Sequence, residues 1–276
     1  MHGSGGLRAC RSTRKAPHGF IPSFNEGNRL PRTLTALRSW LEVSGLVYRV
    51  LVVDDGSSDG TASVSDEFGP KFSTLRLPAQ RGKGAAVRAG MRAATGRVVA
   101  FTDADLPYEL AALRIGYEWI ESGDCEVVFG ARDIAGAETH VPRRPARALA
   151  SLLFRRVTKR LISRDVTDTQ CGLKIFSGRA AMAIFERTIV DGFAFDTEVV
   201  WLCRRLGLDW RRVPVTLVNE YSSTLSISRH AWRMLWDVPR LLIAHRTLAR
   251  IIHKPTLTRS ASFDVARSTP SSLSRW

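Results

Sequence analysis

The sequence has few cysteines and no long apolar run. Its four cysteines lie far apart and form no Cys-x-x-Cys pair: Cys10, Cys125, Cys171 and Cys203. This spacing argues against a structural zinc motif or a disulfide framework and favours a reducing compartment. No apolar run reaches the roughly 18 residues of a membrane-spanning helix, and no apolar stretch follows the basic N-terminus as in a signal peptide. We therefore expect a cytoplasmic protein, either soluble or peripheral on the cytoplasmic face of a membrane.

Acidic residues are scarce overall, but the excess of basic residues is confined to three segments. The 276 residues include 41 Lys and Arg against 26 Asp and Glu, which gives a net charge of +15. Residues 1–19 and 143–164 hold four and eight basic residues without an acid, and residues 229–276 hold nine against two. The rest of the chain is slightly acidic. This distribution argues against a nucleic-acid binder, which would be more evenly basic, and for localised contacts with anions.

Residues 143–164 and 229–254 have apolar side chains at helical spacing with arginines between them. Two interpretations of these basic amphipathic helices are open. At least one rests on an anionic membrane surface, or both pack on the body with solvated arginines. Residues 1–19 are expected to be a flexible basic terminus and the Ser/Thr-rich residues 255–276 a disordered tail. One globular domain is expected over residues 20–228.

Within this domain, buried strands alternate with helices. Val50–Val53 and Val98–Phe101 have the uninterrupted apolar character of parallel strands covered on both faces. Helices are expected over residues 82–95 and 110–122. The alternation predicts an α/β fold with a mostly parallel, Rossmann-like sheet and helices on both faces. Ligands of such sheets bind at the carboxyl ends of the strands, so five residues at predicted strand ends should line one crevice: Asp54, Asp55, Asp103, Asp105 and Arg132.

Asp103 and Asp105 follow a buried strand in the stretch RVVAFTDADLPYE. At positions i and i+2 of an extended chain, their carboxylates would project to one side. Such a pair suits Mg²⁺ or Mn²⁺, which takes carboxylate oxygens and completes its shell with substrate phosphate. The alternative is an exposed turn whose aspartates cap the next helix.

Three further motifs have both a functional and a structural interpretation. Asp55, in DDGSSDGT, could accept hydrogen bonds from a nucleoside or could cap backbone N–H groups of its own turn. Lys83, between two glycines in RGKGAAVRAG, opens a helix and favours an anion there. Asp196, in GFAFDTEVVWL, could be catalytic or could be a helix N-cap.

Seven motifs occur in an order that resembles the family 2 glycosyltransferases of GT-A fold, and among them most closely the polyprenyl (dolichyl) phosphate sugar transferases. The resemblance covers roughly residues 20–225 and rests on the following stretches: PSFNEGNRL, VVDDGSSDGT, RGKGAAVRAGM, FTDADLP, FGARD, DTQCGLKIF and FAFDTEVVWL. It implies a GT-A domain that transfers a hexose, with glucose on UDP favoured and mannose on GDP next, from a nucleotide sugar to a polyprenyl or dolichyl phosphate with inversion.

The resemblance also implies a role for each matching residue. Pro22, Asn25, Glu26, Asp55, Lys83 and Asp103 would bind the nucleotide. Asp103 and Asp105 would hold Mg²⁺ or Mn²⁺, with Asp105 as the main ligand. Asp105, Asp196 and Arg132 would be catalytic. Asp168, Gln170 and Lys174 would lie around the donor sugar and the acceptor.

Two stretches depart from the family pattern. Only Phe20 and Ile21 supply apolar side chains to the first strand, so this strand is short or the N-terminus is atypical. Ser222–Thr224 stands where the family often has Gly-Ser-Lys, so a phosphate-binding lysine is missing there. These departures favour one alternative, an inactive nucleotide-binding homologue. A second alternative keeps the chemistry but uses a soluble acceptor, such as a small phosphorylated acid or another sugar.

Overall fold

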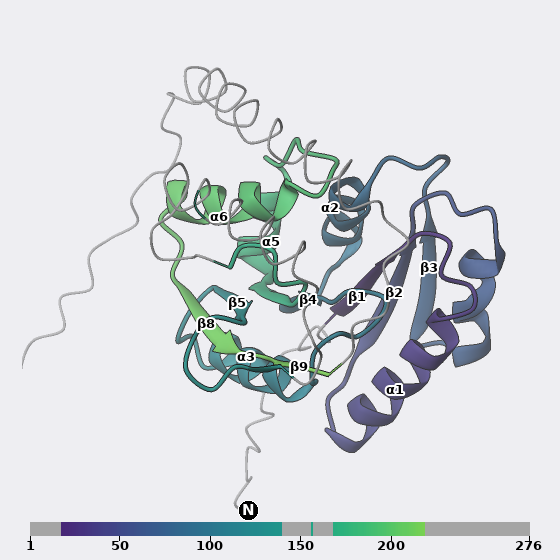
Figure 1. The fold of residues 1–276 in the computed structure, drawn as a ribbon. Helices are drawn as coiled ribbons and strands as arrows, with labels where there is room; N and C mark the ends of the chain where they lie inside the picture. Colours follow the sequence, from purple (N-terminus) through teal and green to yellow (C-terminus); the bar gives the residue numbers. More distant parts are fainter. Residues whose placement is uncertain (1–17, 140–155, 157–167, 219–276) are drawn as a thin grey trace, which may run out of the picture. The chain divides into compact units, whose positions relative to one another are not determined.

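The computed structural model describes residues 18–139, 156 and 168–218. In this part a seven-stranded sheet is flanked by helices (Figure 1). The strands of the sheet are β1 (His18–Ser23), β2 (Arg49–Asp54), β3 (Phe72–Arg76), β4 (Val98–Phe101), β5 (Val127–Ala131), β7 (Lys174–Ser177) and β8 (Trp210–Pro214). The helices are α1 (Leu30–Val43), η1 (Gly60–Phe68), α2 (Lys83–Ala93), α3 (Ala111–Glu121), α5 (Gly178–Phe185) and α6 (Phe195–Arg205).

Several predictions fall outside this part of the chain. They concern the basic terminus before His18, the basic segment 143–164 apart from Arg156, Ser222–Thr224, the helix over 229–254 and the tail over 255–276. Among the described helices, none combines the length and the apolar character needed to cross a membrane.

The strand order is β3-β2-β1-β4-β7-β5-β8, and every pairing is parallel except those of β7, which runs antiparallel to both β4 and β5. The mostly parallel α/β fold was therefore predicted correctly. The reversed strand has a consequence for the site. Lys174, the first residue of β7, pairs with Phe101 and Phe129. The loop that precedes β7 therefore reaches the same sheet edge as the carboxyl ends of the parallel strands. A second small sheet joins β6 (Glu138–Thr139) to β9 (Thr216–Leu217).

The first strand is longer than its two apolar side chains suggest. β1 has six residues, pairs along its whole length with β2, and pairs with β4 over His18–Phe20. The carbonyl of Phe20 points to the β4 side and accepts from the N–H of Thr102, the residue after β4. The carbonyl of Ser23 points to the β2 side and accepts from the N–H of Asp55, the residue after β2. Pro22 shares the β4 side with Phe20, but pairing with β4 has ended there. The missing proline N–H therefore costs no ladder bond, which explains a proline in a central strand.

Helices cover both faces of the sheet, as predicted (Figure 1). On one face, α1 buries Leu30, Leu34 and Leu37 against residues of β1 and β2, and α3 covers β4, β5 and β7. On the other face α2, α5 and α6 contact one another. Five phenylalanines fill this second layer through a chain of ring contacts: Phe20, Phe101, Phe176, Phe185 and Phe195.

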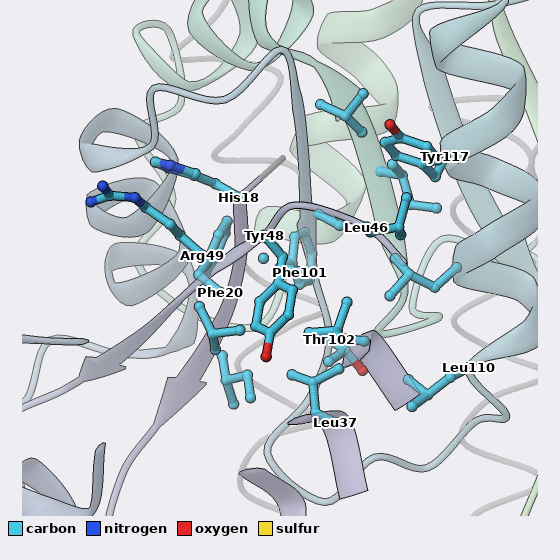
Figure 2. A pocket seen from close by; sticks show the side chains of 18 of the residues that line it. His18, Phe20, Leu37, Leu46, Tyr48, Arg49, Phe101, Thr102, Leu110 and Tyr117 are labelled. Atoms are coloured by element: carbon cyan, nitrogen blue, oxygen red, sulfur yellow. The ribbon is translucent and has the colours of Figure 1, made fainter. Parts of the chain in front are cut away.

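A narrow apolar cavity of about 60 Å³ lies between the sheet and helices α1 and α3 (Figure 2). Its lining includes His18, Arg49 and Val98, which begin three of the parallel strands. Tyr48 also lines it, and its buried hydroxyl has no hydrogen-bond partner within the described part of the chain. Small-molecule sites are typically several hundred Å³. We therefore interpret this cavity as imperfect packing of the α1 and α3 layer and not as a substrate site.

Candidate active site

Asp54 is the last residue of β2, Asp55 follows it, and both are buried. Asp54 accepts a hydrogen bond from the N–H of Ser57 (3.0 Å) within the DDGSS turn. Asp55 accepts from the backbone N–H groups of Arg81 (2.9 Å) and Gly82 (2.7 Å). Both carboxylates therefore cap backbone N–H groups, as the structural alternative for these residues predicts. The N–H groups that Asp55 caps, however, belong to residues 81 and 82 and not to its own turn. Asp55 thereby fixes the start of α2 against β2, and its nucleoside role stays a prediction.

Asn25 and Glu26 follow β1 in a turn held by the neighbouring DDGSS segment. The N–H of Asn25 donates to Ser57 Oγ (2.8 Å) and that of Glu26 donates to Thr61 Oγ1 (2.8 Å). Asn25 has a positive φ of 54°, a conformation that asparagine tolerates better than most residues. The turn therefore has a fixed shape, as a pocket wall needs. Pro22 lies buried just before it in β1.

A cleft of about 510 Å³ opens beside this turn. Asn25, Glu26 and Asp105, three of the predicted site residues, line it together with residues of α1. Arg29 and Arg32 also line it, and the sequence analysis assigned neither of them a role. The cleft therefore combines the predicted nucleotide wall, the predicted metal ligand and two guanidinium groups suited to phosphate.

The two aspartates of the DAD motif lie in a turn and not on an extended chain. β4 ends at Phe101, and the N–H of Leu106 donates to the carbonyl of Asp103 (3.1 Å). The reasoning from strand alternation was therefore wrong, although the pair still begins where the strand ends. Asp103 forms an ion pair with Lys83 Nζ (2.5 Å), while Asp105 borders the cleft.

The Asp103 carboxylate packs directly against Gly172 and occupies the space that a side chain would need there. A Cβ atom at this position would lie 2.0 Å from Asp103 Oδ2 and 2.5 Å from Cγ, far inside van der Waals contact. The φ of Gly172 is not in the left-handed region, so this glycine is needed for space and not for its backbone conformation. The sequence analysis gave it no role, because a glycine in DTQCG has no signal that names its partner.

Asp105 is in an environment that disfavours its charge. Burial, with a contribution from the neighbouring Asp103, raises its pKa to about 6, although Lys83 and Arg29 oppose the shift. A divalent cation would remove both causes by neutralising the two carboxylates. Among the described residues no group of three or more His, Cys, Asp or Glu side chains gathers as a metal site. Two carboxylates are nevertheless enough for Mg²⁺ or Mn²⁺ that also binds substrate phosphate, so the residues present fit the predicted ion.

Lys83 keeps its charge despite its enclosed position. Burial alone would lower its pKa, but Asp103 and Asp196 outweigh this effect and raise it. The ammonium also lies 5.8 Å from the centre of the Phe195 ring, at cation–π distance. The structure therefore holds a fixed positive charge directly beside the DAD turn.

Arg132 follows β5 and is locked by Asp168. Nε and Nη2 of Arg132 donate to the two oxygens of Asp168 (2.8 and 2.6 Å), and the Arg132 N–H donates as well (3.1 Å). Burial alone would lower the pKa of Arg132, but the hydrogen bonds with Asp168 outweigh this effect, so the pKa lies well above its ordinary value. Asp168 therefore orients Arg132. Nearby, the buried Nε2 of Gln170 has no partner among the described residues and is an available donor.

Lys174 and Asp196 form a buried ion pair, with side chains 1% and 2% exposed. The Lys174 ammonium also donates to the carbonyls of Thr169 (3.1 Å) and Cys171 (2.7 Å), so all three of its donors are used. The N-cap of α6 is Ala194, so the capping interpretation of Asp196 was wrong. Burial raises the pKa of Asp196, although Lys174 and Lys83 oppose it. In this geometry the pair holds the 169–173 loop on α6, and the predicted roles of both residues at the acceptor and in catalysis stay predictions.

The comparisons with known proteins agree with this fold and identify the family. The family described as "Glycosyl transferase family 2" matches residues 20–187, so the chain belongs to glycosyltransferase family 2. This confirms the predicted family and the predicted enzyme class.

Curated relatives extend the match over most of the chain. The dolichyl-phosphate beta-glucosyltransferase of Drosophila melanogaster is 31% identical over 242 residues, covering 79% of this chain and 73% of that protein. The human protein of the same name is 30% identical over 232 residues, covering 76% and 71%.

Solved structures support the fold alone. The mannosyl-3-phosphoglycerate synthase from Rubrobacter xylanophilus has a TM-score of 0.67 at 18% identity, covering 88% of this chain and 79% of that one. The glucosyl-3-phosphoglycerate synthase from Mycobacterium tuberculosis, solved with Mn²⁺, UDP and glucosyl-3-phosphoglycerate, has a TM-score of 0.61 at 16% identity. The match covers 81% of the present chain and 80% of the synthase.

Proposed function

We propose that this glycosyltransferase transfers glucose from UDP-glucose to a polyprenyl phosphate of the dolichyl type, with inversion at the anomeric carbon. The observation that carries the proposal is the 31% identity to a dolichyl-phosphate beta-glucosyltransferase over 79% of the chain. The gathering of acidic and basic side chains at the carboxyl edge of the sheet supports it independently. The soluble acceptors named for the structural neighbours are a weaker guide, because those proteins are only 14–18% identical.

The reaction forms one bond and breaks one. An oxygen of the lipid phosphate attacks the anomeric carbon, and the bond from this carbon to the donor diphosphate breaks, so that UDP leaves with the electron pair. The acceptor is already an anion and does not require deprotonation by a general base. This chemistry is consistent with an Asp196 that neutralises Lys174 and is not free to act as a base.

The acidic residues around the cleft would hold the metal ion, and the basic residues would stabilise the donor diphosphate. Asp105 and Asp103 would hold Mg²⁺ or Mn²⁺ at the donor diphosphate, where such an ion supplies Lewis-acid neutralisation of the leaving group. Lys83 and Arg132 would add preorganised positive charge, since Asp103 and Asp168 hold them in place. Asn25, Glu26 and Asp55 would fix the nucleoside side. Gln170, whose Nε2 has no partner in the part of the chain that the structure describes, would donate to the sugar or the acceptor.

The test uses the purified full chain with radiolabelled UDP-glucose and GDP-mannose. With short-chain dolichyl phosphate in mixed micelles, label from UDP-glucose should enter the organic phase, and EDTA should abolish the transfer. Preferential transfer from GDP-mannose would correct the donor. Label that enters 3-phosphoglycerate and no lipid would favour the soluble-acceptor alternative, and the absence of transfer from any nucleotide sugar would favour an inactive homologue.

We also propose that the protein acts as a peripheral protein on the cytoplasmic face of an anionic membrane. The support is the confinement of the excess positive charge to residues 1–19, 143–164 and 229–276. Flotation with vesicles of phosphatidylcholine and phosphatidylserine should show binding that grows with phosphatidylserine and is lost in high salt. No flotation at any composition would refute this part of the proposal.

A further inference from the structure

Asp191 lies in the loop between α5 and α6, and its carboxylate binds Arg81 of the RGKG turn (residues 81–84) and Arg88 of α2. Oδ2 accepts from Arg81 Nη2 (3.1 Å), and Oδ1 accepts from Arg88 Nη2. Arg88, on α2, is only 12% exposed, so this ion pair is partly shielded from water. One side chain therefore ties both the entry to α2 and the middle of that helix to a distant loop.

The backbone of the same loop supports the start of α2. The N–H of Ala85 donates to the carbonyl of Asp191 (3.2 Å). Cβ atoms at Gly82 and Gly84 would lie 2.6 Å from the Asp191 carbonyl and 2.4 Å from the Val190 carbonyl. The two glycines of RGKG are therefore required because the turn lies directly on this loop.

The loop is itself anchored from α6. Glu198 accepts from the backbone N–H groups of Ile189 (2.9 Å) and Val190 (3.0 Å). On its other side the RGKG turn is held by Asp55 through two backbone hydrogen bonds. Asp55 and Asp191, which come from different elements, thus hold the turn between them, and Lys83 leaves this turn to meet Asp103.

We infer that Asp191 is a positioning residue that sets the affinity for the donor diphosphate by fixing the RGKG turn and thereby Lys83. The inference rests on the proposed function for the identity of the ligand. Loss of the Asp191 charge leaves Arg88 without its counter-ion and releases Arg81 from the loop. The start of α2 then gains freedom, and the ammonium of Lys83 is no longer held at one position. Binding that depends on a fixed charge falls when the charge moves.

The variant for the test is Asp191→Asn, which keeps the size of the side chain and removes its charge. We expect the dissociation constant of UDP, measured by calorimetry with Mn²⁺, to rise about 10-fold, as for loss of one charge-assisted contact. Asp191→Glu should recover most of the affinity. The matched control is Asp124→Asn, whose ion pair with Arg211 (3.2 Å) lies on different elements with both side chains 46% exposed, and it should leave the affinity unchanged.

A double-mutant cycle with Lys83→Met separates positioning from general stability. If Asp191 acts through Lys83, Asp191→Asn should weaken UDP binding by no more than about 2-fold in the Lys83→Met background. An equal loss in both backgrounds would overturn the inference, as would an unchanged affinity in Asp191→Asn alone.

Amide hydrogen exchange gives an outcome that does not depend on the ligand. In Asp191→Asn, the amides of residues 81–88 should exchange several-fold faster than in the wild type and in Asp124→Asn. If the wild type binds neither UDP nor GDP, the proposed donor class fails, and unchanged exchange in these amides would separately refute the holding role of Asp191.

Discussion

Gly172→Ala is the substitution that most directly tests the seating of Asp103. The added methyl carbon would lie 2.0 Å from Asp103 Oδ2. Since the obstacle is the end of a short side chain and not backbone, Asp103 is expected to rotate away, and the rest of the loop is expected to stay in place. The rotation breaks the ion pair with Lys83, in which the two side chains are 19% and 28% exposed. Its loss, with some overpacking, should cost about 1–2 kcal/mol of stability.

The effect on activity should be much larger than the effect on stability. A domain of this size loses roughly 2–4 °C in Tm per kcal/mol, so the melting temperature should fall by only several degrees. A displaced carboxylate at the proposed diphosphate site should lower kcat/KM about 100-fold. The assays are thermal unfolding by circular dichroism and transfer of labelled sugar to dolichyl phosphate. The control is Gly60→Ala, where a Cβ would meet nothing within 4 Å and where φ is not positive.

A double-mutant cycle decides whether the clash is with Asp103. In an Asp103→Ala background, Gly172→Ala should cost less than about 0.5 kcal/mol, because the clashing atoms are gone. An undiminished stability cost in that background would refute the reasoning, since the obstacle would then be another group. Wild-type activity in Gly172→Ala would also refute it.

Three other substitutions test separate parts of the structure. The pKa of Asp105 is about 6 in the fold, above its ordinary value of 3.8, so the folded state binds more protons between these values and stability falls as pH rises through that window. Asp105→Asn should therefore raise the Tm in EDTA at pH 7 but not at pH 3.5 and should abolish stabilisation by Mn²⁺; a lower Tm at pH 7 would contradict the assignment. Lys174→Met leaves the Asp196 carboxylate buried without its counter-ion and should lower the unfolding free energy by roughly 3–5 kcal/mol in urea titrations, while adding Asp196→Leu should restore part of it. Gly19→Ala adds a methyl group where nothing lies within 4 Å, in a strand beside the apolar cavity of Figure 2, and should raise stability by about 0.5–1 kcal/mol with unchanged activity; a lower Tm would show that the space is already filled.

The fold and the position of the site were predictable from local patterns. Apolar runs such as Val50–Val53 identify the parallel strands, and the rule that ligands bind at strand carboxyl ends places Asp55, Asp103 and Arg132 on one edge. The structure brings these residues to that edge. This part succeeded because short apolar runs identify buried strands, and their alternation with helices implies mostly parallel pairing.

The pairing of charges was not predictable. Lys83 with Asp103, Arg132 with Asp168 and Lys174 with Asp196 are contacts between distant segments, and periodicity has no information about which carboxylate meets which cation. The same limit hid Gly172 and Asp191, whose importance depends on what lies against them. The direction of β7 was hidden too, because a short apolar run looks alike in a parallel and an antiparallel strand.

The placement of β7 has a consequence for how the chain matures during synthesis. β1 to β4 pair among themselves, so four strands find their partners once residue 101 has been made. β5 is different, because its only partners among the described strands are β7 and β8, and residues 132–173 separate it from the first of these. Until Ser177 leaves the ribosome, β4 has an open edge and the fully buried segment Val127–Ala131 has nowhere to pair. Nascent chains that stall in this interval expose two aggregation-prone strands, so the stretch between β5 and β7 is where a slow ribosome or an absent chaperone would harm this protein most.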